Sequence, residues 1–149
     1  MSRHIAPYGI RFREDARIEV FPAVEVLIFG TRERGLRATF HIDSGATVSI
    51  LPLSDASVLG VATASGRGML VRGISGDPLI GHRANIKLQI GSFGRIAVPV
   101  LFVDSVEVPR ILGREGIFDR YGILFDEMQR RTGWFDAKER RAMNGLFKG

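Results

Sequence analysis

Short apolar or alternating stretches recur along the chain from Phe21 onward, and few of them are long enough for a helix. A period of two in stretches of this length is typical of strands with one buried face. Four of these stretches form two pairs, each pair flanking a turn rich in glycine or charge. They predict two hairpins, formed by residues 24–29 with 36–42 and by residues 84–90 with 96–103.

Other segments predict smaller elements. Glycine is dense among apolar residues at 61–82, which predicts a mobile hairpin with its tip near residues 73–78. Residues 53–59 predict one or two helical turns ended by Gly60. The remaining expectations are a loosely ordered arm over residues 1–20, a helix at 114–121, a strand at 123–126 and an amphipathic C-terminal helix from residue 136.

Composition bounds the class of protein. With 149 residues, 45% of them hydrophobic, the chain fits one globular domain. Its apolar stretches are far shorter than the roughly 20 residues of a membrane-spanning helix, and the polar start does not resemble a secretory signal, so we expect a cytoplasmic protein without membrane contact. The absence of cysteine excludes disulfides and thiolate metal sites.

The distribution of charge and the spacing of the histidines limit which ligands we expect the chain to bind. The net charge is +5, and 18 of the 21 basic residues are arginine, but these are scattered and often stand beside Glu or Asp. No basic run interleaves with aromatic residues, so the sequence disfavours nucleic acid. His4, His41 and His82 lack metal-ligand spacing, so we expect no metal and no cofactor, and we interpret His41 as a strand-face residue. Trp134 is interpreted as a packing or dimer-contact residue.

The turn Asp43-Ser44-Gly45-Ala46 carries the candidate chemistry. Asp-Ser-Gly is also an ordinary turn sequence, since Asp and Ser accept local backbone hydrogen bonds and Gly allows positive φ. Here, however, apolar strand-like residues flank it on both sides. Two carboxylates that share one proton can hydrolyse a peptide, one as base and one as acid. Each then needs a tight loop, with a hydroxyl residue next and a glycine after it.

Taken together, these features resemble a retropepsin-type aspartic protease of the bacterial kind. The resemblance spans roughly residues 20–127 and rests on the Asp43 loop, the glycine-rich hairpin and the later Ile111-Leu112-Gly113-Arg114, in that order. It implies an all-β, closed or partly closed barrel with a flap hairpin and one short helix after Gly113. The C-terminal helix expected from the amphipathic pattern is an addition that the family core does not require. We expect an N-terminal arm (1–20), the protease domain (21–135) and a C-terminal helical extension (136–149).

The resemblance also implies roles for individual residues. Asp43 would be the catalytic carboxylate, Ser44 would brace the two loops of a homodimer, and Gly45 would contact the substrate main chain. The further site residues are Ala46 in the loop, Gly73, Ile74, Ser75 and Gly76 in the flap, and Ile111, Leu112, Gly113 and Arg114 near the site. The substrate would be an extended peptide bound as an added strand.

A second Asp-Thr/Ser-Gly is missing, so one chain encodes half a site, and a symmetric dimer would complete it through strands near the termini. Viral members have an acidic residue at the position of Thr47, where it pairs with the arginine equivalent to Arg114. The sequence leaves Glu115, Asp119 and Asp104 as candidate partners. The alternatives are a catalytically silent peptide-binding or scaffolding dimer and, more weakly, an Arg-rich nucleic-acid-binding barrel.

Overall fold

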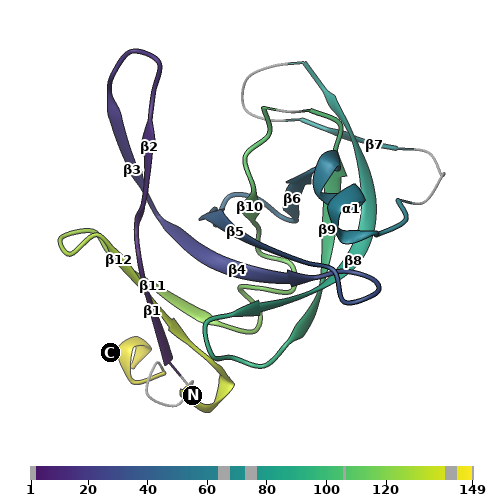
Figure 1. Cartoon of the computed structure of the whole chain (residues 1–149). Helices are drawn as coiled ribbons and strands as arrows, with labels where there is room; N and C mark the ends of the chain where they lie inside the picture. The colour runs from purple at the N-terminus through teal and green to yellow at the C-terminus, as the bar shows by residue number, and fades with distance from the viewer. Residues whose placement is uncertain (1–2, 64–67, 73–76, 106, 140–143, 149) are drawn as a thin grey trace.

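The computed structural model describes residues 3–63, 68–72, 77–105, 107–139 and 144–148 (Figure 1). It is built almost entirely from strands, with one short α-helix, α1 (Leu53–Leu59). The strands are β1 (Arg3–Pro7), β2 (Gly9–Phe12), β3 (Ile18–Phe21), β4 (Ala23–Phe29), β5 (Gly35–Ile42), β6 (Ser49–Pro52), β7 (Met69–Val71), β8 (Leu79–Ile90), β9 (Ile96–Val103), β10 (Ile111–Leu112), β11 (Gly122–Asp126) and β12 (Arg131–Phe135).

Seven strands form the main sheet, in the order β4-β5-β10-β6-β9-β8-β7. β4 also pairs with β8, so the sheet returns on itself as a partly closed barrel. The two predicted hairpins, β4–β5 and β8–β9, are both present and both antiparallel. The predicted all-β, retropepsin-like fold class is therefore confirmed.

The period-two pattern explains which side chains fill the barrel. Successive side chains of a strand point to opposite faces, and alternate residues of β4, β5 and β8 are buried while those between them are more exposed. Val26, Phe40 and Leu88 are fully buried on these strands, and Leu59 adds the end of α1 to the same core. Gly60 ends that helix with a left-handed φ of 65°, as its sequence position predicts.

A second sheet of three strands, β1-β12-β11, lies beside the barrel (Figure 1). It joins the barrel core through Trp134 on β12, which is fully buried, donates a hydrogen bond from Nε1 to Thr132 Oγ1 at 3.0 Å and meets the edge of Tyr121. This agrees with the interpretation of Trp134 as a packing residue.

The structure differs from the sequence-based expectation at both ends and after Gly113. Residues 3–21 are not a loosely ordered arm: β1 pairs with β12, and β2 pairs with β3. Residues 114–120 form consecutive hydrogen-bonded turns in place of the expected regular helix. The described part of the expected C-terminal helix consists of two 3-10 helices, Ala137–Glu139 and Gly145–Phe147.

Candidate active site

Asp43 follows directly on β5 and begins a tight turn. Its Oδ1 accepts a hydrogen bond from the Gly45 N–H at 2.8 Å, and its carbonyl oxygen accepts one from the Ala46 N–H at 3.3 Å. Asp43, Ser44 and Gly45 are all exposed, although the strands on either side are buried in the barrel. The barrel thus presents a carboxylate, a hydroxyl and a bare backbone together at its surface.

The strand β10 supports this turn through backbone hydrogen bonds. It is inserted between β5 and β6, parallel to the first and antiparallel to the second. The Asp43 N–H donates to the Leu112 carbonyl at 3.0 Å, and the Arg114 N–H donates to the Ala46 carbonyl at 2.9 Å. The structure therefore brings together the two motifs that the sequence singled out, although about seventy residues separate them.

Gly113 lies at the closest approach of these two segments. Its N–H donates to Ser49 Oγ at 3.0 Å, and Ser49 is fully buried. A Cβ on residue 113 would lie 2.5 Å from both the carbonyl carbon and the carbonyl oxygen of Val48. Only glycine fits between the two backbones without moving one of them.

The side chain of Arg114 also binds the turn. Its guanidinium donates to the Ser44 carbonyl at 3.0 Å and to Thr47 Oγ1 at 3.4 Å. Glu115, one of the candidate partners from the sequence, instead binds Arg83 at 2.8 Å. Thr47, where the resemblance implied an acidic residue, is thus a neutral acceptor for Arg114.

The flap candidate is the hairpin of β7 and the start of β8. Met69, Leu70 and Val71 pair antiparallel with Gly81, Ile80 and Leu79, respectively. The side chains of Met69, Leu70 and Ile80 are about half exposed or more. The predicted tip, Gly73 to Gly76, lies outside the described residues.

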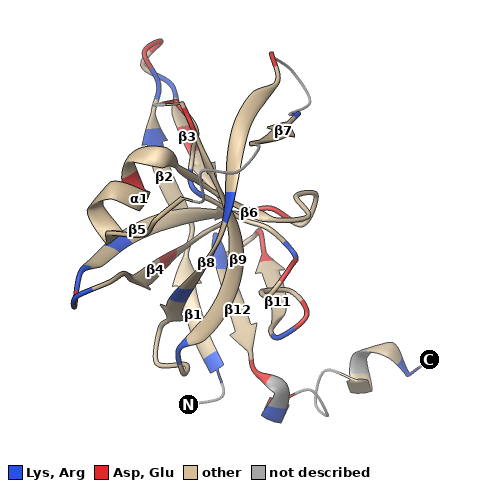
Figure 2. Ribbon diagram, turned by 90° about the vertical axis from the view of Figure 1, so that its right-hand side faces the viewer, with Lys and Arg blue, Asp and Glu red and all other residues tan. Residues whose placement is uncertain are grey.

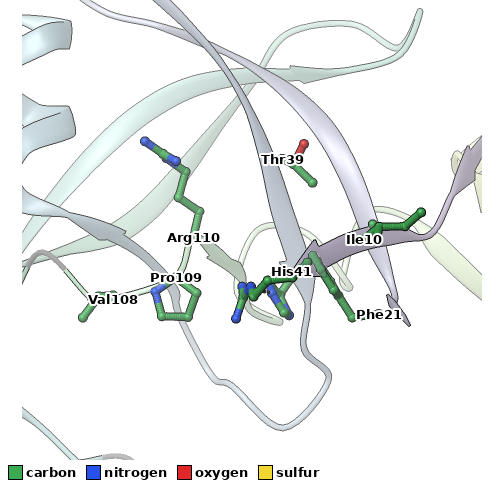
Figure 3. A pocket seen from close by; sticks show the side chains of 9 residues that line it. Ile10, Phe21, Thr39, His41, Val108, Pro109 and Arg110 are labelled. Carbon is green, nitrogen blue, oxygen red and sulfur yellow. Dashed lines mark hydrogen bonds between the residues drawn. The ribbon is translucent and has the colours of Figure 1, made fainter. Parts of the chain in front are cut away.

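A cavity of about 320 Å³ lies beside β5 (Figure 3). Phe21 from β3 and His41 from β5 form part of its lining, with their rings stacked at a centroid distance of 3.8 Å. The rest of the lining comes from β2, from Thr39 and from Val108, Pro109 and Arg110. Since Asp43 is two residues beyond His41, the cavity is a neighbour of the candidate active site.

The electrostatics of His41 favour its neutral form. Burial lowers its pKa below the ordinary value of 6.5, and the nearby positive charge of Arg11 lowers it further. The guanidinium Nη2 of Arg11 lies 2.7 Å from His41 Nε2. Because a guanidinium can only donate, this nitrogen of the imidazole is the acceptor.

The segment that leads into β10 is fixed by a partly buried ion pair. The Arg110 guanidinium donates to both carboxylate oxygens of Asp55 on α1, at 2.7 and 2.8 Å. The Asp55 side chain is only 5% exposed, and its hydrogen bonds raise the pKa of Arg110. The backbone N–H of His41 also donates to the Arg110 carbonyl at 2.9 Å. Arg110 is therefore bonded both to α1 and to β5.

Sequence reasoning missed the β2–β3 hairpin and therefore missed this cavity. A signal was present, because residues 9–12 and 18–21 alternate between apolar and polar around a charged turn. Pro7 and Gly9 concealed it, since both residues usually interrupt a strand. In the structure they lie at the junction of two separate strands.

Among the residues that the structure describes, the basic side chains do not form a single surface. Lys and Arg are interspersed with Asp and Glu over many elements (Figure 2). Arg37 pairs with Glu25 at 2.8 Å and Arg131 with Asp126 at 2.9 Å. Within the described residues, no helix is both long enough and apolar enough to cross a membrane.

Comparison with known proteins supports the same class. A family model described as aspartyl protease matches residues 24–115, which is more than half of the chain. The chain therefore belongs to the aspartyl protease family. The match includes the Asp43 turn, the β7–β8 hairpin and β10, and it leaves out β1, β2, β3, β11 and β12.

A solved structure of this class shares the fold. A retropepsin-like aspartic protease from Rickettsia conorii superposes with a TM-score of 0.55 at 15% identity, covering 89% of this chain and 92% of that chain. EIAV protease in complex with the inhibitor HBY-793 gives a TM-score of 0.48 at 22% identity, covering 63% and 82%. No curated protein sequence matches. The predicted aspartic protease family is confirmed, the retropepsin-like fold agrees with the Rickettsia conorii structure, and family and fold together support an aspartic protease function.

Proposed function

We propose that the chain is an aspartic endopeptidase in which Asp43 is the catalytic carboxylate. The observation that carries the proposal is the Asp43 turn itself, which is exposed at its tip yet fastened by β10 and Arg114 on two sides. An ordinary surface turn does not need such support. A catalytic carboxylate does, because its position relative to the substrate must hold within fractions of an ångström.

A homodimer would complete the site. One carboxylate cannot serve as base and acid at once, and two carboxylates close together share one proton because both cannot ionise easily. A twofold axis next to Asp43 would place it beside its symmetry mate. The exposure of Ser44 and Gly45 supports this arrangement, since both would then be covered by the second copy or by the substrate.

The chemistry follows from the pair. The unprotonated carboxylate takes a proton from a water molecule as that water attacks the peptide carbonyl carbon, and the protonated carboxylate donates its proton to the carbonyl oxygen. The C–N bond of the resulting gem-diol then breaks as the first carboxylate passes its proton to the departing nitrogen, and one gem-diol hydroxyl returns a proton to the second carboxylate. The substrate binds as an added strand, with its main chain against Gly45. Because the pair must hold one proton, hydrolysis should be fastest at acidic to mildly acidic pH.

The test is hydrolysis of a diverse peptide library between pH 4 and pH 7, with and without a pepstatin-type inhibitor. Asp43→Asn should abolish cleavage, whereas Asp104→Asn, at an exposed aspartate just after β9, should cleave like wild type. Sedimentation equilibrium should show a dimer for all three chains. Cleavage by Asp43→Asn, or by a strictly monomeric wild type, would refute the proposal. Peptide binding without cleavage by wild type would indicate the silent dimer instead.

A further inference from the structure

The β2–β3 hairpin has one apolar face. Ile10 is directly opposite Val20, and Phe12 is directly opposite Ile18, so all four side chains point to the same side of the ribbon. They are 63%, 41%, 78% and 62% exposed, respectively. Four large apolar side chains therefore form one continuous exposed surface, which we call the hairpin face.

The opposite side of the ribbon binds the hairpin's own subunit. Arg11 is paired with Glu19 in the register, and its guanidinium also lies over the Phe21 ring and contacts His41. The Ile42 N–H donates to the Pro22 carbonyl at 3.1 Å, one residue before the catalytic candidate. The base of the hairpin is therefore attached beside the Asp43 turn. Phe12, Ile18 and Val20 of the hairpin face are not part of the cavity lining there, whereas Ile10 also contributes to it (Figure 3).

The rest of the hairpin leaves the body of the molecule. Figure 1 shows β2 and β3 extending beyond the barrel, and the two strands form a sheet of their own. An isolated two-stranded hairpin is at best marginally stable in water, and it usually needs packing against another surface. Large exposed apolar patches mark contact sites for the same reason.

We propose that the hairpin face packs against a second copy of this chain. The inference rests on the proposed function, in which the Asp43 turn is incomplete without that copy and a twofold axis passes beside it. The ribbon is attached one residue from Asp43 and extends away from its own barrel. Because the partner's site would lie next to Asp43, the ribbon would extend toward the partner subunit. Both copies then contribute the same hairpin, as symmetry requires.

The test uses neutral polar substitutions that leave the attached side of the ribbon unchanged. The double variant Phe12→Gln with Ile18→Gln removes one cross-strand apolar pair from each subunit. The matched control is Val58→Gln on α1, where the side chain is 51% exposed and remote from the hairpin. Sedimentation equilibrium should give the double variant a dimer dissociation constant at least tenfold above that of wild type, and the control should equal wild type. Circular dichroism checks that all three chains are folded.

A labelling experiment tests contact directly and does not depend on weakening the dimer. The chain has no cysteine, so Ile10→Cys and Val58→Cys each carry one unique thiol for an environment-sensitive fluorophore. Dilution through the dissociation constant should shift the emission of the Ile10 label to the red, as the label passes from a dry contact into water. The Val58 label should not change. Equal behaviour of the two labels would overturn the proposal.

The outcomes separate this inference from the proposed function. If the double variant dimerises as wild type does, the hairpin face is not the interface, while hydrolysis by wild type keeps the protease assignment. If the double variant keeps its dimer but its KM for peptide rises, the hairpin contacts substrate, and the inference is wrong. A wild type that is monomeric at every concentration overturns the inference outright. Asp43→Asn should lose hydrolysis and keep the wild-type dissociation constant.

Discussion

Gly113→Ala adds one methyl group at the contact between β10 and the end of the Asp43 turn. That methyl would lie 2.5 Å from the carbonyl atoms of Val48 and 2.9 Å from its backbone nitrogen. Backbone atoms cannot rotate out of the way as a side chain can, so one of the two segments must move. The movement also strains the hydrogen bond from the residue 113 N–H to Ser49 Oγ.

The expected cost follows from two contributions. Overpacking at a closely packed position costs about 1–3 kcal/mol, and weakening a buried hydrogen bond costs roughly another 1 kcal/mol. We therefore expect Gly113→Ala to lower the free energy of unfolding by about 2–4 kcal/mol. Because the same movement displaces the Asp43 carboxylate, kcat should fall by about 100-fold, as is typical of a misplacement near 1 Å.

Urea unfolding and peptide hydrolysis, measured on the same preparations, check both numbers. Gly94→Ala is the matched control, because a Cβ there meets nothing within 4 Å and the position lies in the turn between β8 and β9. It should unfold within about 0.5 kcal/mol of wild type and keep wild-type kcat. If Gly113→Ala equals this control in both assays, the close approach of β10 does not position the turn.

Three further substitutions test the supports around the turn. Asp55→Ala leaves the Arg110 guanidinium without its partner, and since Arg110 remains partly exposed we expect a loss of about 2 kcal/mol in urea unfolding. Thr47→Val removes a 3.4 Å contact of the exposed Arg114, so stability should fall by less than about 1 kcal/mol and hydrolysis should persist. Burial lowers the pKa of His41 below 6.5, so the unfolded chain binds more protons than the folded chain below that pH. Stability should therefore fall as pH drops below 6.5, and His41→Gln should flatten this decline in thermal unfolding.

Much of the barrel could be predicted because its strands carry local signals. The hairpins β4–β5 and β8–β9 consist of alternating or continuous apolar stretches with a turn between their strands, and both appeared where expected. Gly60 ended α1 as predicted, because the left-handed backbone at a helix end is a local requirement. In contrast, the turns after Gly113 contain only a few helical hydrogen bonds, because Gly116 adopts a left-handed φ of 78° that a regular helix cannot include.

Local sequence patterns could not predict the pairing of the terminal strands. β1 has Pro7 at its end and pairs only with β12, more than 120 residues away, so neither strand shows its role without the other. β12 contains Gly133, which weakens a strand signal, and its place as the central strand of its sheet, with Trp134 fully buried, depends on both neighbouring strands. Such pairing depends on contacts distant in the chain, which a local pattern does not record.

By itself, the sequence determined the family and the turn that carries Asp43, and it led to the proposal of a second carboxylate. It could do so because each of these depends on residue identity and order along the chain. Only the tertiary structure decided which groups hold that turn. Arg114 donates hydrogen bonds to Ser44 and Thr47 rather than to an acidic residue. The hairpin face is recognised as exposed only because the structure shows that the other side of the hairpin contacts His41. These choices depend on distances between segments far apart in the chain, and only packing sets those distances.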